Sequence, residues 1–166
     1  MQFIVPSLLL PLALAAPSLV SRDDANSTAP DASALTPWQI TSLNTHSPSG
    51  RPGNDPHSTL NFSIADTAST AKCSAQWIQS EGVPSGEEQV CETESGEGSW
   101  SFEFIGDSGR ASSFEMSVKL VDAEGKTFVA EGPFATGGAL SGQCGGSGVC
   151  NWSLKDAPFE FQQSEQ

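Results

Sequence analysis

Basic residues are scarce in this chain. Among its 166 residues only seven are Lys or Arg, against 20 Asp or Glu, which gives a formal net charge of -13. A protein that binds nucleic acid needs clustered Lys and Arg to neutralise phosphates, and similar clusters hold proteins on anionic membrane surfaces. The composition therefore argues against both kinds of partner. Two interpretations of the acidity remain: solubility in an extracellular medium, and a partner with a basic surface.

Long apolar runs are also missing beyond the first residues. No later segment approaches the roughly 18 consecutive apolar residues of a membrane-spanning helix. The apolar stretch from Phe3 to Ala16 is short and broken by proline, and Ala13-Leu14-Ala15 has the small-x-small pattern that precedes signal-peptidase cleavage. We therefore predict a signal peptide over residues 1–15 and a secreted, extracellular protein. Residues 16–36 are rich in Ala, Ser, Asp and Pro, and predict a disordered N-terminal arm.

No window shows the sustained apolar stripe of an amphipathic helix. From Trp38 onward apolar and polar residues alternate, which is typical of strands with one buried face. The longest alternating run places four apolar residues on one face: Phe114, Met116, Val118 and Leu120. Asp122 to Gly125 then predicts a hairpin turn. Eight or so short strands predict an all-β fold, a single compact antiparallel β-barrel or sandwich over residues 37–163, with long loops at 44–56, 79–89 and 137–148.

Four cysteines occur in the sequence: Cys73, Cys91, Cys144 and Cys150. In a secreted chain they predict two disulfides, and the sequence alone permits three pairings. None of their spacings matches a zinc site. Three Asn-x-Ser/Thr sequons, at Asn26, Asn61 and Asn151, are candidates for N-glycosylation. The strand alternation places Asn61 and Asn151 on outer faces.

Chemistry-bearing residues do not converge on a catalytic motif. His46, Asp55 and His57 lie in or beside one Pro/Gly-rich loop, where solvent-exposed histidines are favoured over a metal site. A glycosidase needs two carboxylates that face each other across a cleft, and among the many acids only Glu103 lies centrally in a clear strand. The serines include no G-x-S-x-G nucleophile elbow. We predict that the chain is not an enzyme and binds no cofactor or metal.

The tryptophans suggest one alternative function. Sugar-stacking platforms of a carbohydrate-binding or cell-wall module are often built from exposed indoles. All four tryptophans, however, are in phase with apolar neighbours on the buried faces: Trp38, Trp77, Trp100 and Trp152. Core packing is therefore the favoured interpretation of these residues.

Several motifs follow one another in a recognisable order: Trp38-x-Ile40, Leu60-Asn61-Phe62-Ser63-Ile64, Cys73-Ser74-Ala75-Gln76, Cys91, an aromatic strand and a late cysteine pair. In this order they resemble the fungal Alternaria major-allergen family, small secreted β-barrel proteins that include elicitors of plant cell death. The similarity covers roughly residues 37–154. It implies a host-facing β-barrel without known catalytic residues, in which Cys73 pairs with Cys91 and Cys144 with Cys150.

Two departures limit what the resemblance implies. Members of the family can dimerise through an additional N-terminal cysteine, which this chain lacks, so we expect no covalent dimer. The chain also has no tyrosine, so no contact made by tyrosine elsewhere in the family can be transferred.

These observations predict a secreted fungal, non-enzymatic effector-like or elicitor-like protein that binds a partner at the host interface. Its acidic 79–97 segment favours a basic extracellular host protein as the partner, because opposite charge steers association. The contact candidates are four glutamates: Glu87, Glu88, Glu92 and Glu94.

Overall fold

The computed structural model describes residues 35–166, apart from the side chains of residues 107 and 108. The signal peptide predicted for residues 1–15 lies outside this part of the chain, as does nearly all of the predicted arm. Within residues 35–166 the chain forms twelve strands: β1 (Trp38–Ser47), β2 (His57–Ala65), β3 (Thr70–Ile78), β4 (Gln89–Val90), β5 (Glu92–Ser95), β6 (Ser99–Arg110), β7 (Ser113–Val121), β8 (Thr127–Ala135), β9 (Leu140–Cys144), β10 (Cys150–Leu154), β11 (Phe159–Phe161) and β12 (Gln163–Glu165). Within the same residues, no helix has the length and apolar character needed to cross a membrane.

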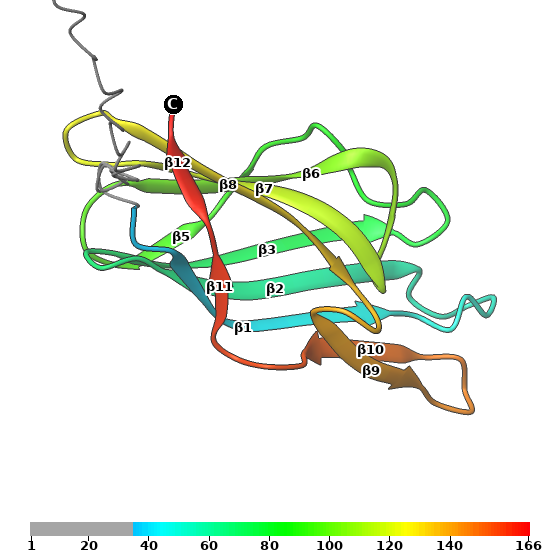
Figure 1. The fold of residues 1–166 in the computed structure, drawn as a ribbon. Coiled ribbons are helices and arrows are strands. Elements are labelled where there is room, and N and C mark those ends of the chain that lie inside the picture. Colours follow the sequence, from blue (N-terminus) through cyan, green and yellow to red (C-terminus); the bar gives the residue numbers. More distant parts are fainter. Residues whose placement is uncertain (1–34) are drawn as a thin grey trace, which may run out of the picture. The chain divides into compact units, whose positions relative to one another are not determined.

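The strands form two antiparallel sheets that pack face to face (Figure 1). The seven-stranded sheet has the order β5-β3-β2-β1-β10-β9, and β11 also pairs with β1. The five-stranded sheet has the order β12-β8-β7-β6-β4. Of the two predicted all-β forms, the described residues adopt the sandwich, since neither sheet closes on itself into a barrel.

Aromatic pairs join the two sheets in the middle of the core. Three aromatic residues of β6 each meet one aromatic residue of the opposite sheet in an edge-to-face contact. The pairs, with their centroid separations, are Trp38–Trp100 at 4.7 Å, Phe62–Phe102 at 5.0 Å and Trp77–Phe104 at 5.4 Å. Such geometry is favourable beyond simple burial, so β6 is the strand that couples the sheets most directly.

The predicted register of the longest strand is confirmed. The four apolar residues of β7 are buried, Glu115 is exposed and Lys119 is half-buried.

The predicted hairpin turn is also present, between β7 and β8. The Asp122 carboxylate accepts hydrogen bonds from the backbone N–H groups of Glu124 and Lys126, both at 2.9 Å, and Gly125 adopts a left-handed conformation with φ 81°.

Two of the predicted long loops are shorter than expected. β1 continues to Ser47 because both of its edges are paired, with β2 and with β10, so residues 44–47 are strand and the loop covers only 48–56. The glycine-rich segment 137–148 contains β9, which pairs along β10. Gly142 permits this pairing, because a Cβ there would lie 2.1 Å from the carbonyl oxygen of Asn151.

Candidate functional site

The acidic segment lies along one edge of the sandwich. β4 is the edge strand of the five-stranded sheet and β5 is the edge strand of the seven-stranded sheet, so the segment passes from one sheet to the other within a few residues. Cys91, between the two strands, is bonded to Cys73 of β3, and its backbone N–H donates to the carbonyl of Trp100 at 2.9 Å. The pairing that the resemblance implied is confirmed here, and it anchors the middle of the acidic edge.

The four candidate glutamates are all exposed, but two of them have partners within the chain. The carboxylate of Glu88 forms an ion pair with Lys119 of β7, and that of Glu94 pairs with Lys72 of β3 at 2.5 Å. Glu87 and Glu92 form no ion pair with a described residue. Exposed ion pairs contribute little to stability, but these two partly neutralise the edge.

Glu88 is the most constrained of these carboxylates. The hydrogen bond with Lys119 holds the pKa of the Glu88 carboxyl below its usual value, and a second hydrogen bond, donated by the Ser101 hydroxyl at 2.7 Å, acts in the same direction. On the other side of the disulfide, the hydrogen bond with Glu94 raises the pKa of Lys72.

We predict that Glu88 titrates below the 4.5 of an unperturbed glutamate. Because its folded pKa is depressed, the contribution of its contacts to stability is present above that unfolded value and is lost as the pH falls through the folded pKa. A carbon-detected NMR titration of the side-chain carboxyl measures the midpoint. The Lys119→Met variant should shift it upward, and an identical midpoint in the two proteins would contradict the assigned cause.

Val90 gives the acidic edge an apolar centre that sequence reasoning missed. It is 82% exposed, the only large hydrophobic side chain exposed to this degree among the described residues. It lies on β4 between the Glu87–Glu88 pair and the disulfide, and together with Glu92 it borders a shallow hollow on the outer face of β2 and β3. The available signal was its phase: Val90 precedes the buried Cys91 and must therefore face outward.

Glu103, the acidic residue that the sequence places centrally in a strand, does not face a second carboxylate across a cleft. Glu103 lies on the outer face of the five-stranded sheet, level with Ser117 of β7 and Glu131 of β8. Glu103 and Glu131 are thus two strands apart, about 10 Å, on the same flat face. A glycosidase instead requires carboxylates on opposite sides of the scissile bond. Glu103 and Glu131 point outward side by side.

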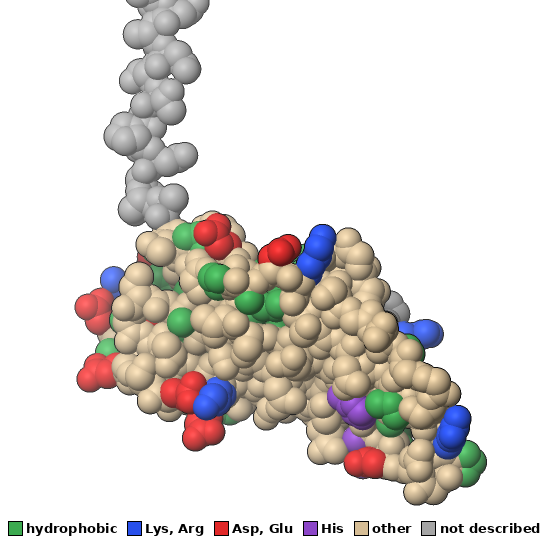
Figure 2. Space-filling view, turned by 90° about the horizontal axis from the view of Figure 1, so that it is seen from below, with side chains coloured by type: hydrophobic (Ala, Val, Ile, Leu, Met, Phe, Trp, Pro, Cys, Tyr) green, Lys and Arg blue, Asp and Glu red, His purple; other side chains and the backbone are tan. Residues whose placement is uncertain are grey.

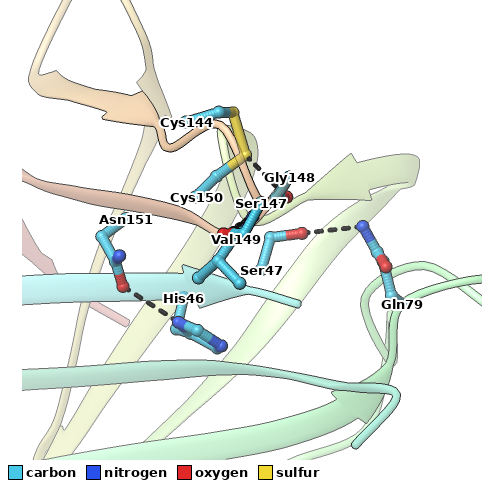
Figure 3. The surroundings of a disulfide bond; sticks show 9 residues. All are labelled: His46, Ser47, Gln79, Cys144, Ser147, Gly148, Val149, Cys150 and Asn151. Atoms are coloured by element: carbon cyan, nitrogen blue, oxygen red, sulfur yellow. Dashed lines mark hydrogen bonds between the residues drawn. A yellow bond between two sulfur atoms is a disulfide. The ribbon is translucent and has the colours of Figure 1, made fainter. Parts of the chain in front are cut away.

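The two histidines have separate partners. His46, on β1, lies with Nδ1 2.9 Å from Oδ1 of Asn151 on β10 (Figure 3). His57, at the start of β2, lies with Nδ1 2.5 Å from Oδ1 of Asp55, and this hydrogen bond lowers the pKa of the Asp55 carboxyl. Among the described residues, no three His, Cys, Asp or Glu side chains gather as metal ligands would.

Three of the four tryptophans are buried as predicted, and the fourth is partly so. Trp38, Trp77 and Trp100 belong to the core, and none of them presents an open ring face on the outer surface. Trp152 packs against the core as predicted but is only half-buried. The reason lies in the widths of the sheets: β10 and β9 extend past the cover that the five-stranded sheet provides (Figure 1).

Two of the three sequons lie in the described residues, on the outer face of the seven-stranded sheet. Asn61 and Asn151 are exposed, as the alternation predicted, whereas Asn26 lies outside the described residues. The register places uncharged polar side chains around them: Asn44, Ser74, Gln143 and Ser153. Figure 2 shows this face from below as a broad surface of uncharged groups with the charged side chains gathered toward its margins.

Comparison with known proteins adds no relative to this description. The chain matches no protein-family model, no curated protein and no solved structure.

Proposed function

We propose that this chain is a secreted, non-enzymatic binding protein of the effector or elicitor type, acting at a fungal–host interface as its sequence resemblance implies. The observation that carries the proposal is the acidic edge, in which an exposed apolar side chain, Val90, stands among carboxylates on edge strands pinned by a disulfide. Edge strands present unpaired backbone groups, and rigid scaffolds commonly carry recognition surfaces on such peripheral segments.

The chemistry of this edge favours a basic extracellular protein as the partner. The carboxylates of Glu87 and Glu92 form no ion pair with a described residue, so they are available to cations on the partner. The exposed side chain of Val90 adds an apolar contact to these charged ones. Complementary charge accelerates association, whereas desolvated apolar contacts mainly slow dissociation.

All four cysteines are held in intrachain disulfides, so no covalent dimer is proposed. On a secretory route, exposed Asn61 and Asn151 would accept N-linked glycans on the outer face of the seven-stranded sheet, where Asn61 lines the same shallow hollow as Val90 and Glu92.

The test is to capture a partner from host extracellular fluid and measure its binding rates against salt. Replacing four glutamates with glutamine, Glu87, Glu88, Glu92 and Glu94, should slow association about threefold to tenfold at low salt and flatten its salt dependence. Val90→Ser should mainly raise the dissociation rate.

A matched control removes the same charge elsewhere. Glutamine at four other exposed positions, Glu115, Glu131, Glu160 and Glu165, changes the net charge equally without touching the edge. The proposal predicts a smaller effect on association from this control. If the two variants slow association equally, net charge alone explains the effect and the edge has no special role. If the association rate changes neither with salt nor in either variant, the partner is not recognised by its basic charge. Turnover of a polysaccharide or ester by the purified protein would refute the non-enzymatic function.

A further inference from the structure

A hollow opens between the sheets at the end where the β9–β10 hairpin extends past the five-stranded sheet. Its volume is about 660 Å³, within the range of small-molecule sites. Its walls come from four parts of the chain: the inner face of β1 to β3, the 79–83 segment, residues 109–112 and the Cys144–Cys150 disulfide. Figure 3 shows this disulfide near Ser47 and Gln79.

The inner face of the seven-stranded sheet changes character in this region. Elsewhere it is apolar, but here the inward positions are hydroxyls: Thr45, Ser47 and Ser58, all buried. Thr45 donates to the carbonyl of Ala111 at 2.7 Å, and Ser47 accepts from the Gln79 amide at 2.9 Å. Three buried hydroxyls on one sheet face are unexpected in a core, where aliphatic side chains pack without polar cost.

Ser58 distinguishes this hollow from a packing defect. Its side chain is 1% exposed and lines the hollow, and its hydroxyl makes no hydrogen bond with another described residue. Among the described residues, Nε1 of Trp38 is the one fully enclosed polar side-chain atom without a hydrogen-bond partner, so the Ser58 hydroxyl is not sealed in the core but borders the hollow. A hydroxyl held in this position is suited to bind a polar group that enters the hollow.

The other residues that line the hollow add apolar surface and one charge of each sign. The half-buried indole of Trp152 and the edge of Trp77 offer apolar surface beside the hydroxyls and the Gln79 amide. Apolar C–H faces next to hydroxyl edges are the surface that a sugar ring presents. One carboxylate, Glu81, and one guanidinium, Arg110, also line the hollow, so its formal charge is balanced in a chain of net charge -13.

The walls are preformed. The backbone N–H of Val83 donates to the carbonyl of Gly109 at 3.2 Å, and a Cβ at Gly109 would lie 2.4 Å from a methyl of Val83, so the 79–83 wall lies directly against β6. On the other side the disulfide closes the β9–β10 hairpin, where Gly145 donates to the carbonyl of Val149 at 2.8 Å. A site that is already ordered loses less entropy when a ligand binds.

We propose that this hollow binds a neutral, hydroxyl-rich ligand of monosaccharide or disaccharide size. The hollow shares residues 79–83 with the acidic segment but contains none of the four candidate glutamates, so the two proposals can fail independently.

Calorimetric titration of the full secreted protein tests the site with glucose, N-acetylglucosamine and cellobiose as neutral probes, and with glucuronate and glucosamine as charged ones. We expect at least one neutral sugar to bind and to shift the NMR signals of Ser47, Ser58 and Trp152. The charged analogue of that sugar should bind at least about fivefold more weakly. Ser58→Ala and Trp152→Ala should each weaken binding by about fivefold or more.

The control is Ser141→Ala, which alters an exposed residue on the outer face of the β9–β10 hairpin, outside any sequon, and should leave binding unchanged. Ser58→Ala removes a single oxygen, so it keeps the test valid even if Trp152→Ala unfolds. The proposal fails if no neutral probe binds up to about 10 mM, a range that includes weak single-site sugar affinities. It fails equally if only a charged sugar binds, or if Ser141→Ala weakens binding as much as Ser58→Ala.

Discussion

Replacing Phe114 with alanine is expected to lower the free energy of unfolding by about 3–5 kcal/mol, the usual cost of deleting a buried aromatic ring. Phe114 is 4% exposed. Its ring lies edge-on to Phe104 at 5.6 Å and stacks on Phe134 at 5.5 Å, so the deletion leaves a cavity between β6, β7 and β8. Because Phe104 in turn contacts Trp77 of the opposite sheet, the loss also weakens the contact between the two sheets. Urea unfolding followed by tryptophan fluorescence measures the change.

The adjacent residue provides the control. Glu115→Ala removes a comparable number of atoms from the same strand, but its side chain is exposed on the outer face between Ile105 and Pro133. Surface substitutions of this kind stay within about 0.5 kcal/mol. Similar losses from the two variants would mean that β7 does not present alternate residues to the core, and would contradict the structure as well as the sequence pattern.

The features that the sequence predicted well are those that depend on near neighbours along the chain. The inward face of β7 follows from alternation alone, because successive residues of a strand point to opposite sides. The hairpin from Asp122 to Gly125 follows from local turn chemistry, in which an Asp side chain caps backbone N–H groups and glycine accepts a positive φ. The outward positions of Asn61 and Asn151 have the same local origin.

The features that were missed depend on which strands become neighbours. Trp152 alternates correctly with Asn151, yet its exposure is set by the limited width of the opposite sheet, which no local pattern encodes. The ion pair of Glu88 with Lys119 joins residues of different strands and became visible only with the β4–β6–β7 order. The hollow has the same origin, because Ser47 and Ser58 become adjacent through the pairing of β1 with β2 and face a gap that the sheets leave between them.

The disulfide pairing was predictable only in part. Residue spacing left three pairings open, and only the resemblance favoured Cys73–Cys91 with Cys144–Cys150, which the structure confirms. Strand pairing supplies the physical reason. Cys150 lies directly opposite Cys144 in the β9–β10 ladder, and Cys91 directly precedes β5, the edge strand that pairs with β3.

Removing the first disulfide with Cys73→Ala and Cys91→Ala together is expected to lower the free energy of unfolding by about 3 kcal/mol. The bond spans 18 residues, and closing a loop of this length removes that much chain entropy from the unfolded state on the loop-closure model. The corresponding double variant at Cys144 and Cys150 is the matched control. Its bond spans six residues, so the same model gives about 2 kcal/mol. Denaturant unfolding of both variants measures the difference, and a larger loss at the shorter loop would contradict the entropic account.

The same variant separates global stability from local order at the acidic edge. β4 has two residues and β5 has four, and each pairs along only one neighbouring strand, so the covalent bond at Cys91 is their strongest tie to the sandwich. Without it we expect amide hydrogens of residues 87–95 to exchange by local opening, well before the core strands β2 and β7 do. Association with a basic partner should then weaken even where the protein remains folded, because the ordering of Val90 and its flanking glutamates must occur during binding. The Cys144 and Cys150 variant should leave exchange at residues 87–95 unchanged. Protection of the edge that survives loss of its disulfide would show that the β3–β5 and β4–β6 ladders alone hold it in place.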